Sequence, residues 1–248
     1  MDVFAGVAAG AASTLLTHPL DVIKIQLQVG GQVEVSQRAL YRGIMPNLIG
    51  NTIAWGSYYG MYSWFQHNIK GYFDGPSLYW VSSFLAGAST SFCTSPIWVV
   101  KTRMVASAGT AQYRTMLSTC REIALKNGIQ GFWRGFPLSL VGTVQAAIHF
   151  SIYDSIKDRY FETAPPMAKY MVTSAISKTI AATLLYPHQV VRTRMQNTNQ
   201  RFVETTIQTY KSIGLGGFYK GLLPALARVV PAMCITQVTY ETIMAYKD

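Results

Sequence analysis

The chain has 248 residues, of which 50% are apolar and only 13% are charged, and its net charge is +10. The charged share is about half that of an average soluble protein, which favours a membrane protein over a soluble domain. Its three cysteines have no metal-ligand spacing and no even pairing, so neither a zinc site nor a disulfide framework is indicated.

Six long helices are predicted, although glycine, serine and single charges interrupt every apolar run of spanning length. In chain order they lie near 3–27, 46–67, 79–105, 136–158, 168–196 and 222–246, with short surface helices near 115–126 and 202–213. Membrane helices that tolerate such interruptions line a watery cavity or pack closely through small residues.

Three repeats divide what we expect to be a single transmembrane domain. Turns at 74–76 and 164–166 give boundaries at 1–74, 75–164 and 165–248. The loop of the first repeat is the short one, because its proline-to-aromatic spacing is 22 residues, against 37 and 32 in the other two. We therefore expect little or no surface helix in the first repeat.

Each repeat contains a proline followed five residues later by a base. The copies begin at Pro19, Pro96 and Pro187. On a helix, the second and fifth residues after the proline lie on one face. The side-by-side pairs are Asp21 with Lys24, Trp98 with Lys101, and Gln189 with Arg192.

A second motif, aromatic–base–glycine, also occurs three times. Its copies are Tyr41-Arg42-Gly43, Trp133-Arg134-Gly135 and Tyr219-Lys220-Gly221. Each precedes a proline and, sixteen residues after that proline, a tyrosine: Tyr62, Tyr153 and Tyr240. The glycines are expected to start helices, where free backbone N–H groups attract phosphate.

The positive charge follows the helix alternation. The loops lie at 28–45, 105–135 and 196–221. Together with the proline motifs that precede them, from Pro19, Pro96 and Pro187 onwards, they carry 14 of the 21 basic and 4 of the 11 acidic residues. Six alternating helices would put these loops on one side of a membrane, against anionic lipid. A nucleic-acid binder would not follow this alternation, so no nucleic-acid partner is expected.

These motifs resemble those of the mitochondrial carrier family along the full chain. The family combines Pro-x-acid-x-x-base, aromatic-x-Gly and aromatic-acid-x-x-base motifs in three repeats, and the last is intact at 153–157 and partial at 240–241. Trp98, in place of the second-repeat acid, resembles the branch that carries folate, FAD, NAD and pyrimidine nucleotides. Segments 46–47, 55–56, 141–143, 177–178 and 228–236 resemble its folate and FAD members.

The resemblance implies an all-α membrane protein. Three tandem repeats of two transmembrane helices would form a six-helix pseudo-threefold bundle with short matrix-side surface helices. The expected location is multi-pass in the inner mitochondrial membrane, with a peroxisomal membrane the weaker alternative. The expected partners are a small anionic substrate and cardiolipin beside the aromatic–base–glycine motifs, and the expected oligomeric state is a monomer.

The resemblance also implies two gates. The matrix gate would consist of Asp21, Lys24, Trp98, Lys101, Gln189 and Arg192. Asp21 would pair with Lys101, Gln189 would accept from Lys24, and Trp98 would either stack under Arg192 or only pack between helices. Gln28 and Gln196 would brace this gate or face the loops. The cytosolic gate would consist of Tyr153, Asp154, Lys157, Tyr240 and Glu241, with Lys157 meeting Glu241 and Gln66 meeting Asp154.

The candidate substrate-binding residues lie on the helices between the gates. They are Asn51, Trp55, Val141, Gly142, His149, Lys178 and Arg228. A base deep in an apolar helix usually marks a transport path, which makes Arg228 and Lys178 the main anion ligands. Trp55 offers a surface for a flat ring, and Gly142 leaves space for one.

The function expected from these observations is transport of an anionic cofactor or vitamin, FAD-like or folate-like, by alternating access. An NAD or pyrimidine-nucleotide carrier is the alternative. No catalytic triad, phosphate loop or metal-ligand cluster is present in the sequence, so no enzyme activity, metal or bound cofactor is expected. A membrane enzyme and a non-transporting scaffold are the two other classes left open.

Overall fold

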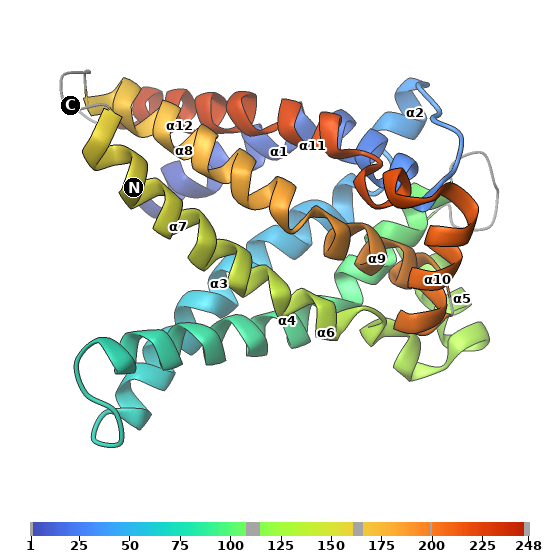
Figure 1. Ribbon diagram of the computed structural model, residues 1–248, viewed down its shortest axis with the longest axis horizontal. Helices are drawn as coiled ribbons and strands as arrows, with labels where there is room; N and C mark the ends of the chain where they lie inside the picture. Colours follow the sequence, from blue (N-terminus) through green and yellow to red (C-terminus); the bar gives the residue numbers. More distant parts are fainter. Residues whose placement is uncertain (1, 108–114, 161–165, 199, 246–248) are drawn as a thin grey trace.

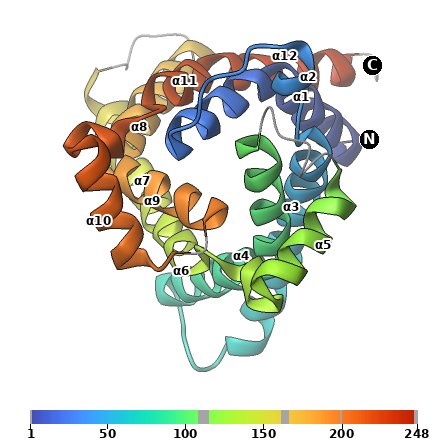
Figure 2. The same cartoon turned by 90° about the vertical axis from the view of Figure 1, so that its right-hand side faces the viewer.

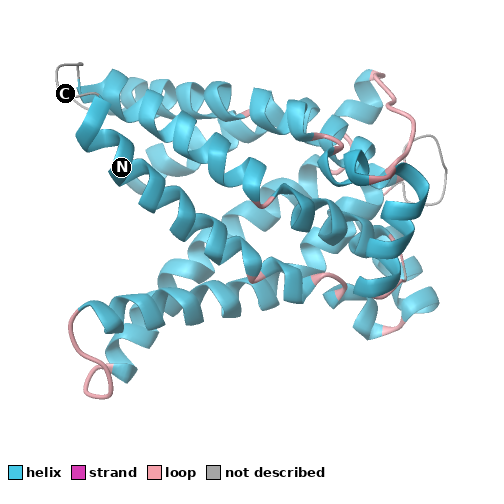
Figure 3. Ribbon diagram, viewed as in Figure 1, coloured by secondary structure: helices cyan, strands magenta, loops and turns pink. Residues whose placement is uncertain are grey.

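The computed structural model describes residues 2–107, 115–160, 166–198 and 200–245, and these are helical apart from turns and loops (Figure 3). The expectation of an all-α protein is therefore confirmed for this part of the chain. The long helices are α1 (Asp2–Val29), α3 (Ile44–Ile69), α4 (Pro76–Ala106), α7 (Val141–Tyr160), α8 (Pro166–Leu184) and α12 (Val229–Ala245).

Shorter elements complete the chain. They are α2 (Gln37–Leu40), α5 (Met116–Asn127), α6 (Phe136–Ser139), α9 (Tyr186–Asn197), α10 (Phe202–Ile213), α11 (Leu222–Ala227) and the 3-10 turns η1 (Ile129–Trp133) and η2 (Leu215–Tyr219). All eight predicted helices are present. Three of the predicted long helices are interrupted, at Leu140, Leu185 and Arg228. Pro187 and Pro231 fall in the first turns of α9 and α12, where proline suits a helix start better than an interior.

The first loop lacks a surface helix of normal length. It contains only α2, which has four residues, whereas α5 and α10 each have twelve. The prediction for the shortened first loop is confirmed. A short helix of this kind makes one turn and cannot bury an apolar stripe of its own.

Contacts between neighbouring helices close a ring (Figure 2). Going round it, α1 contacts α3, α3 contacts α4, α4 contacts α6, and α6 leads into α7. The ring continues from α7 to α8, from α8 to α12, and from α12 back to α1. The two chain ends lie together at one end of the ring, on the left of Figure 1.

The two ends of the ring differ. At one end, which we call the narrow end, α1, α4 and α9 contact one another, and α2, α5 and α10 lie nearby (Figure 1). The helices spread apart towards the end with the chain termini, which we call the wide end. Two buried apolar clusters lie at the narrow end: one centred on Val99, Val100, Met104 and Ile123, the other on Val22, Ile25 and Val105.

In helix α8 apolar side chains are exposed and hydroxyl side chains are buried. Val172, Ile176, Ile180 and Leu184 recur every fourth residue and are exposed, whereas Thr173, Ser174 and Ser177 are buried. An apolar stripe outside and hydroxyls inside is the arrangement that a lipid environment favours. One described stretch, Leu215–Thr236, is long and apolar enough, by length and composition alone, to cross a membrane.

Candidate functional site

A buried ion pair lies at the centre of the narrow end. The Lys101 ammonium donates to the Asp21 carboxylate, and both side chains are only 9% exposed. Lys101 also donates to Asn47 Oδ1 at 2.9 Å. On the other side of the carboxylate, Arg228 Nη1 lies 3.9 Å from Asp21 Oδ1. The ion pair expected between Asp21 and Lys101 is thus present, and a second base shares the acid.

The Lys24 ammonium lies beside this pair and bonds a neutral acceptor. It donates to Gln189 Oε1 at 3.2 Å, as expected from the sequence. Gln189 in turn donates through Nε2 to Gln145 Oε1 at 3.0 Å. This chain of contacts joins α1, α9 and α7 without a carboxylate.

Of the two alternatives for Trp98, the structure agrees with packing between helices, because a Cβ at Gly50 of α3 would meet its ring at 3.3 Å. The cation above the ring is Lys101, with Nζ 5.4 Å from the ring centroid, and not the Arg192 guanidinium. The Trp98 indole N–H donates to Thr94 Oγ1 at 3.2 Å, which fixes the ring against its own helix. Lys101 reaches the ring because both residues lie on the same helix face, three residues apart.

Arg192 has no charged partner among the described residues. Its Nε is buried and makes no hydrogen bond in this part of the chain. Its main-chain carbonyl lies against Gly135, where an added Cβ would come within 3.2 Å of the oxygen. The backbone of Arg192 is therefore held closely while its guanidinium is not neutralised.

Gln28 and Gln196 are buried and join helices, so the loop-facing alternative does not describe them. Gln28 Nε2 donates to the Tyr186 hydroxyl at 3.0 Å, and its Oε1 accepts from Thr193 at 2.8 Å. Gln196 Oε1 accepts from Thr102 at 2.8 Å. Arg194 and Arg103 donate to the main-chain carbonyls of Gln28 and Gln196, respectively.

A cavity of about 330 Å³ opens between these helices. Its charged lining comprises three bases, Lys24, Lys101 and Arg192, but a single acid, Asp21, among the described residues. Gly142 also lines it, and a Cβ built there would meet nothing within 4 Å. An excess of buried positive charge beside open space favours an anionic ligand.

Four other candidate substrate residues belong to α7, α8 and the break between α11 and α12. Arg228 stands between α11 and α12 with its side chain 40% exposed, and its charge acts on Lys178 of α8. Lys178 in turn acts on the ring of His149, on α7. Val141 begins α7 next to Gly142. Electrostatic interactions therefore link Arg228 to Lys178 and Lys178 to His149.

The two candidates on α3 stand apart from that group. Trp55 is 62% exposed and stacks on Tyr59 with centroids 6.0 Å apart, while Tyr58 stacks on Tyr62. Asn51 is half-buried one turn before Trp55. This ladder presents aromatic faces, but within the described ranges no hydrogen bond or ring contact connects it to Arg228.

The wide end makes few of the contacts expected there. Asp154 is exposed, and Gln66 donates to the Tyr62 hydroxyl at 2.8 Å. Tyr153 packs its ring against Tyr170 and His149. The side chains of Lys157, Tyr240 and Glu241 lie outside the described residues. In the described part, the Gln66–Asp154 contact is absent.

Sequence reasoning missed two residues of the central cluster, His18 and Asn47. Asn47 Nδ2 lies 3.1 Å from His18 Nδ1, and His18 Nε2 lies 3.1 Å from the Arg42 carbonyl. Because Lys101 can only donate, Asn47 Oδ1 must accept and Nδ2 must donate, which leaves His18 neutral with its proton on Nε2. The signal available was a polar residue beside each of two repeated prolines, Pro19 and Pro46.

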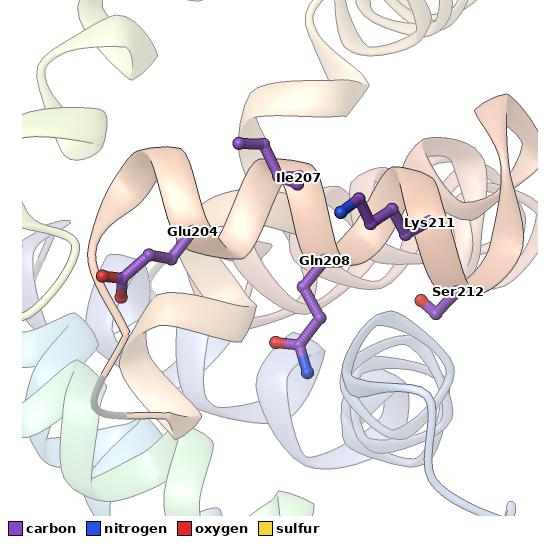
Figure 4. Close-up of a pocket in the computed structure, with 5 residues that line it drawn as sticks. All are labelled: Glu204, Ile207, Gln208, Lys211 and Ser212. Atoms are coloured by element: carbon purple, nitrogen blue, oxygen red, sulfur yellow. The ribbon is translucent and has the colours of Figure 1, made fainter.

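A second hollow, on the outer surface of α10, does not belong to this site. Glu204, Ile207, Gln208, Lys211 and Ser212 line it, all from one helix face (Figure 4). Because this one helix supplies every lining residue, the hollow is a depression on an outer face and not a space between helices. The central cavity, built from α1, α4, α7 and α9, is the better candidate.

Comparison with known proteins agrees with the motifs. The family model described as "Mitochondrial carrier protein" matches residues 1–38, 74–164 and 163–247. The unmatched stretch, 39–73, includes α3 and follows the shortened first loop.

Three relatives illustrate the range of similarity. An uncharacterised mitochondrial carrier of Schizosaccharomyces pombe is 34% identical, over 96% of this chain and 94% of its own length. The mitochondrial FAD carrier protein FLX1 of Saccharomyces cerevisiae is 29% identical, over 98% and 95%. Nicotinamide adenine dinucleotide transporter 2, mitochondrial, of Arabidopsis thaliana is 31% identical, over 98% and 78%.

Proposed function

The chain belongs to the mitochondrial carrier family, and we propose that it transports a nucleotide-like anionic cofactor, FAD first, by alternating access. FAD and NAD, named in two of the relatives, share a diphosphate and a flat ring. Folate gains no support from these names. Members of this family transport rather than catalyse, so no enzyme activity is proposed.

The distribution of charge around the central cavity carries the proposal. Lys24, Lys101 and Arg192 line the cavity, and its acid, Asp21, is already engaged by Lys101. Arg228 and Lys178 add further positive charge. Water-filled, positively charged sites between helices bind anions because the surrounding apolar medium screens charge weakly.

We propose the family's arrangement in the membrane for this chain. Three repeats, 1–74, 75–164 and 165–248, would each contribute two tilted helices to a multi-pass bundle in the inner mitochondrial membrane. The inside-out pattern of α8 supports lipid contact on the outer face of the ring. The basic loops lie at the narrow end, which we therefore assign to the matrix side.

On this assignment the structure is closed towards the matrix. The proposed matrix gate comprises Asp21, Lys24, Trp98, Lys101, Gln189 and Arg192, braced by Gln28 and Gln196. Tyr153, Asp154, Lys157, Tyr240 and Glu241 would form the cytosolic gate in the opposite state. A transporter needs both states to be accessible, and one ion pair at the matrix gate is consistent with this requirement.

Arg228 is a proposed substrate ligand that also contacts the matrix gate. Its guanidinium lies 3.9 Å from the Asp21 carboxylate, which it shares with Lys101. An anionic substrate that attracts Arg228 would remove one of the two cations holding Asp21. The remaining pair would then separate more easily, which couples substrate binding to opening.

The flat ring of the substrate would lie on the α3 side. Trp55 and Tyr59 offer exposed aromatic faces, and Asn51 offers an amide one turn away. Val141 and the open space at Gly142 would leave room on the facing helix, and His149 would donate or accept beside Lys178. FAD fits this combination of ring surface and bases.

We also propose a monomer with cardiolipin as a lipid partner. Gly43, Gly135 and Gly221 precede α3, α6 and α11, so free backbone N–H groups are available at each start. Arg42, Arg134 and Lys220 stand next to these glycines. A phosphate headgroup suits each of the three positions.

The runner-up substrate is NAD or a pyrimidine nucleotide. The relative named for NAD is 31% identical and the one named for FAD 29%, so identity does not separate them. Such a substrate would use the same bases with different ring contacts. FAD stays first because several segments resemble the FAD branch and Trp55 presents a large face.

Exchange by purified protein in liposomes tests the function. We expect liposomes loaded with FAD to take up labelled FAD, and Arg228→Ala to abolish uptake. Uptake of NAD or of pyrimidine nucleotides alone would select the runner-up. No uptake of any of these would leave the family membership standing and overturn the proposed function.

A further inference from the structure

We propose that α9 and Lys24 bind a diphosphate group in the central cavity. The diphosphate would supply the negative charge of the gate acid that Trp98 replaces in this chain. The proposal rests on the proposed function and names where the diphosphate of the substrate would bind, at residues other than Arg228 and Lys178. The residues of this subsite are Arg192 and Gln196, one turn apart on α9, and Lys24 on α1.

Two residues that line the cavity each have one buried donor without a partner among the described residues. The donors are Arg192 Nε and Gln196 Nε2. Gln196 is only 4% exposed. Leaving a buried donor unpaired is costly, so an acceptor is expected there when the site is occupied.

The orientation of Gln196 leaves its amide N–H group available. Thr102 donates to Gln196 Oε1 at 2.8 Å, which turns Nε2 away from that contact. Gln28, the corresponding glutamine on α1, differs because both ends of its amide are occupied, by Tyr186 and Thr193. The two glutamines are therefore a matched pair, one satisfied and the other not.

The charge at this point is also unbalanced. Lys24 bonds the neutral Gln189, and Arg192 is one of its positive neighbours. Within the described residues neither base has a carboxylate in ion-pair range, since Asp21 pairs with Lys101 and Arg228. Trp98 stands at the motif position that is acidic in the family, and the Lys101 ammonium lies over its ring. A diphosphate would supply the missing negative charge and accept from both donors.

Binding of inorganic pyrophosphate to the purified full chain in detergent tests the subsite. We expect Arg192→Gln and Gln196→Leu each to weaken binding at least about tenfold, since each removes a donor to the anion. Arg192→Lys should restore part of the affinity. Arg121→Gln, on the exposed surface of α5, is the control and should change neither the affinity nor the melting temperature.

Trp98→Glu tests the same idea by adding the acid. We expect this variant to have a higher melting temperature without ligand, because the introduced carboxylate would pair with Arg192, and a pyrophosphate affinity at least about tenfold lower. Unchanged pyrophosphate affinity in Arg192→Gln and Trp98→Glu would overturn the subsite.

Flavins separate the failure of the subsite from that of the proposed function. In the wild type we expect FAD to bind more tightly than FMN, and FMN more tightly than riboflavin, with Arg192→Gln narrowing the difference between FAD and FMN. Arg192-dependent pyrophosphate binding without FAD binding or uptake would keep the subsite and refute FAD as substrate. FAD uptake together with pyrophosphate binding that is unchanged in Arg192→Gln would support FAD as substrate and refute the subsite.

Discussion

The narrow and wide ends of the helix ring contain similar residue types, but these residues differ in burial and in their hydrogen-bond partners. At the narrow end Asp21, Lys101 and Asn47 are buried and bonded to one another across three helices. At the wide end Asp154 is exposed, and Gln66 bonds the tyrosine of its own helix instead of a neighbouring helix. Among the described side chains, the expected contacts of Asp21 and Lys24 form at the narrow end, whereas the expected Gln66–Asp154 contact at the wide end does not.

The bonds of Lys101 to Asp21 and Asn47 and both apolar clusters thus belong to the narrow end, where α1, α4 and α9 meet. Changes at the narrow end should therefore affect stability strongly, while equivalent changes at the wide end should affect it little.

The largest effect is expected from breaking the buried ion pair. Lys101→Met should reduce the free energy of unfolding by about 3–5 kcal/mol, because it leaves the Asp21 charge buried without its main partner. Unfolding in detergent measures it. Lys126→Met is the control, since the Lys126–Glu122 pair on α5 is largely exposed and contributes at most about 1 kcal/mol. Equal losses in the two variants would contradict the comparison.

A smaller effect is expected at Asn47. Asn47→Leu should cost about 1–3 kcal/mol, because Lys101 and His18 each lose a buried hydrogen-bond partner. Combined with Lys101→Met, it should cost clearly less than the sum of the two, as for residues in one network. Asn51→Leu, one turn along α3, is the matched control and should leave stability nearly unchanged. Strict additivity would show that Asn47 does not act through Lys101.

The smallest effect is expected at the wide end. Asp154→Asn should change the free energy of unfolding by no more than about 0.5 kcal/mol, because the carboxylate is exposed. Its transport rate should fall more than its stability, if Asp154 closes the opposite state. A decrease in the free energy of unfolding as large as that of Lys101→Met would contradict the smaller contribution of the wide end to stability.

The helices and the central ion pair were largely predictable. The repeated motifs located the helices, and the resemblance to the family, in which the acid of one repeat pairs with the base of the next, implied the contact between Asp21 and Lys101. Pro187 and Pro231 closely follow the helix breaks at Leu185 and Arg228, whereas no proline closely follows the break at Leu140, which the sequence therefore did not reveal. Of the two alternatives for Trp98, stacking under Arg192 was wrong, since a same-helix neighbour three residues away competes successfully with a residue on another helix.

His18 and Asn47 were missed for a different reason. Neither is charged in the observed network, and neither belongs to a repeated charge pattern. Their roles follow from the direction of hydrogen bonds that begin at Lys101, which no spacing rule encodes. Of the proposed substrate ligands, Arg228 and Gly142 lie at the site through helix geometry, whereas Trp55 lies apart from them.

The three glycines that precede α3, α6 and α11 set a limit on how the chain can vary. A Cβ at Gly221 would approach the Lys24 carbonyl to 2.8 Å, and one at Gly135 would approach the Arg192 carbonyl to 3.2 Å. At Gly43 a Cβ would meet the Val105 side chain at 3.0 Å, with the Lys101 carbonyl at 3.6 Å, and all three glycines have positive φ. Each glycine is thus a steric stop against the helix that carries a gate base. A methyl group at any of them would act as a wedge, so inherited substitutions there should disable the protein even though the side chains of the gate remain intact.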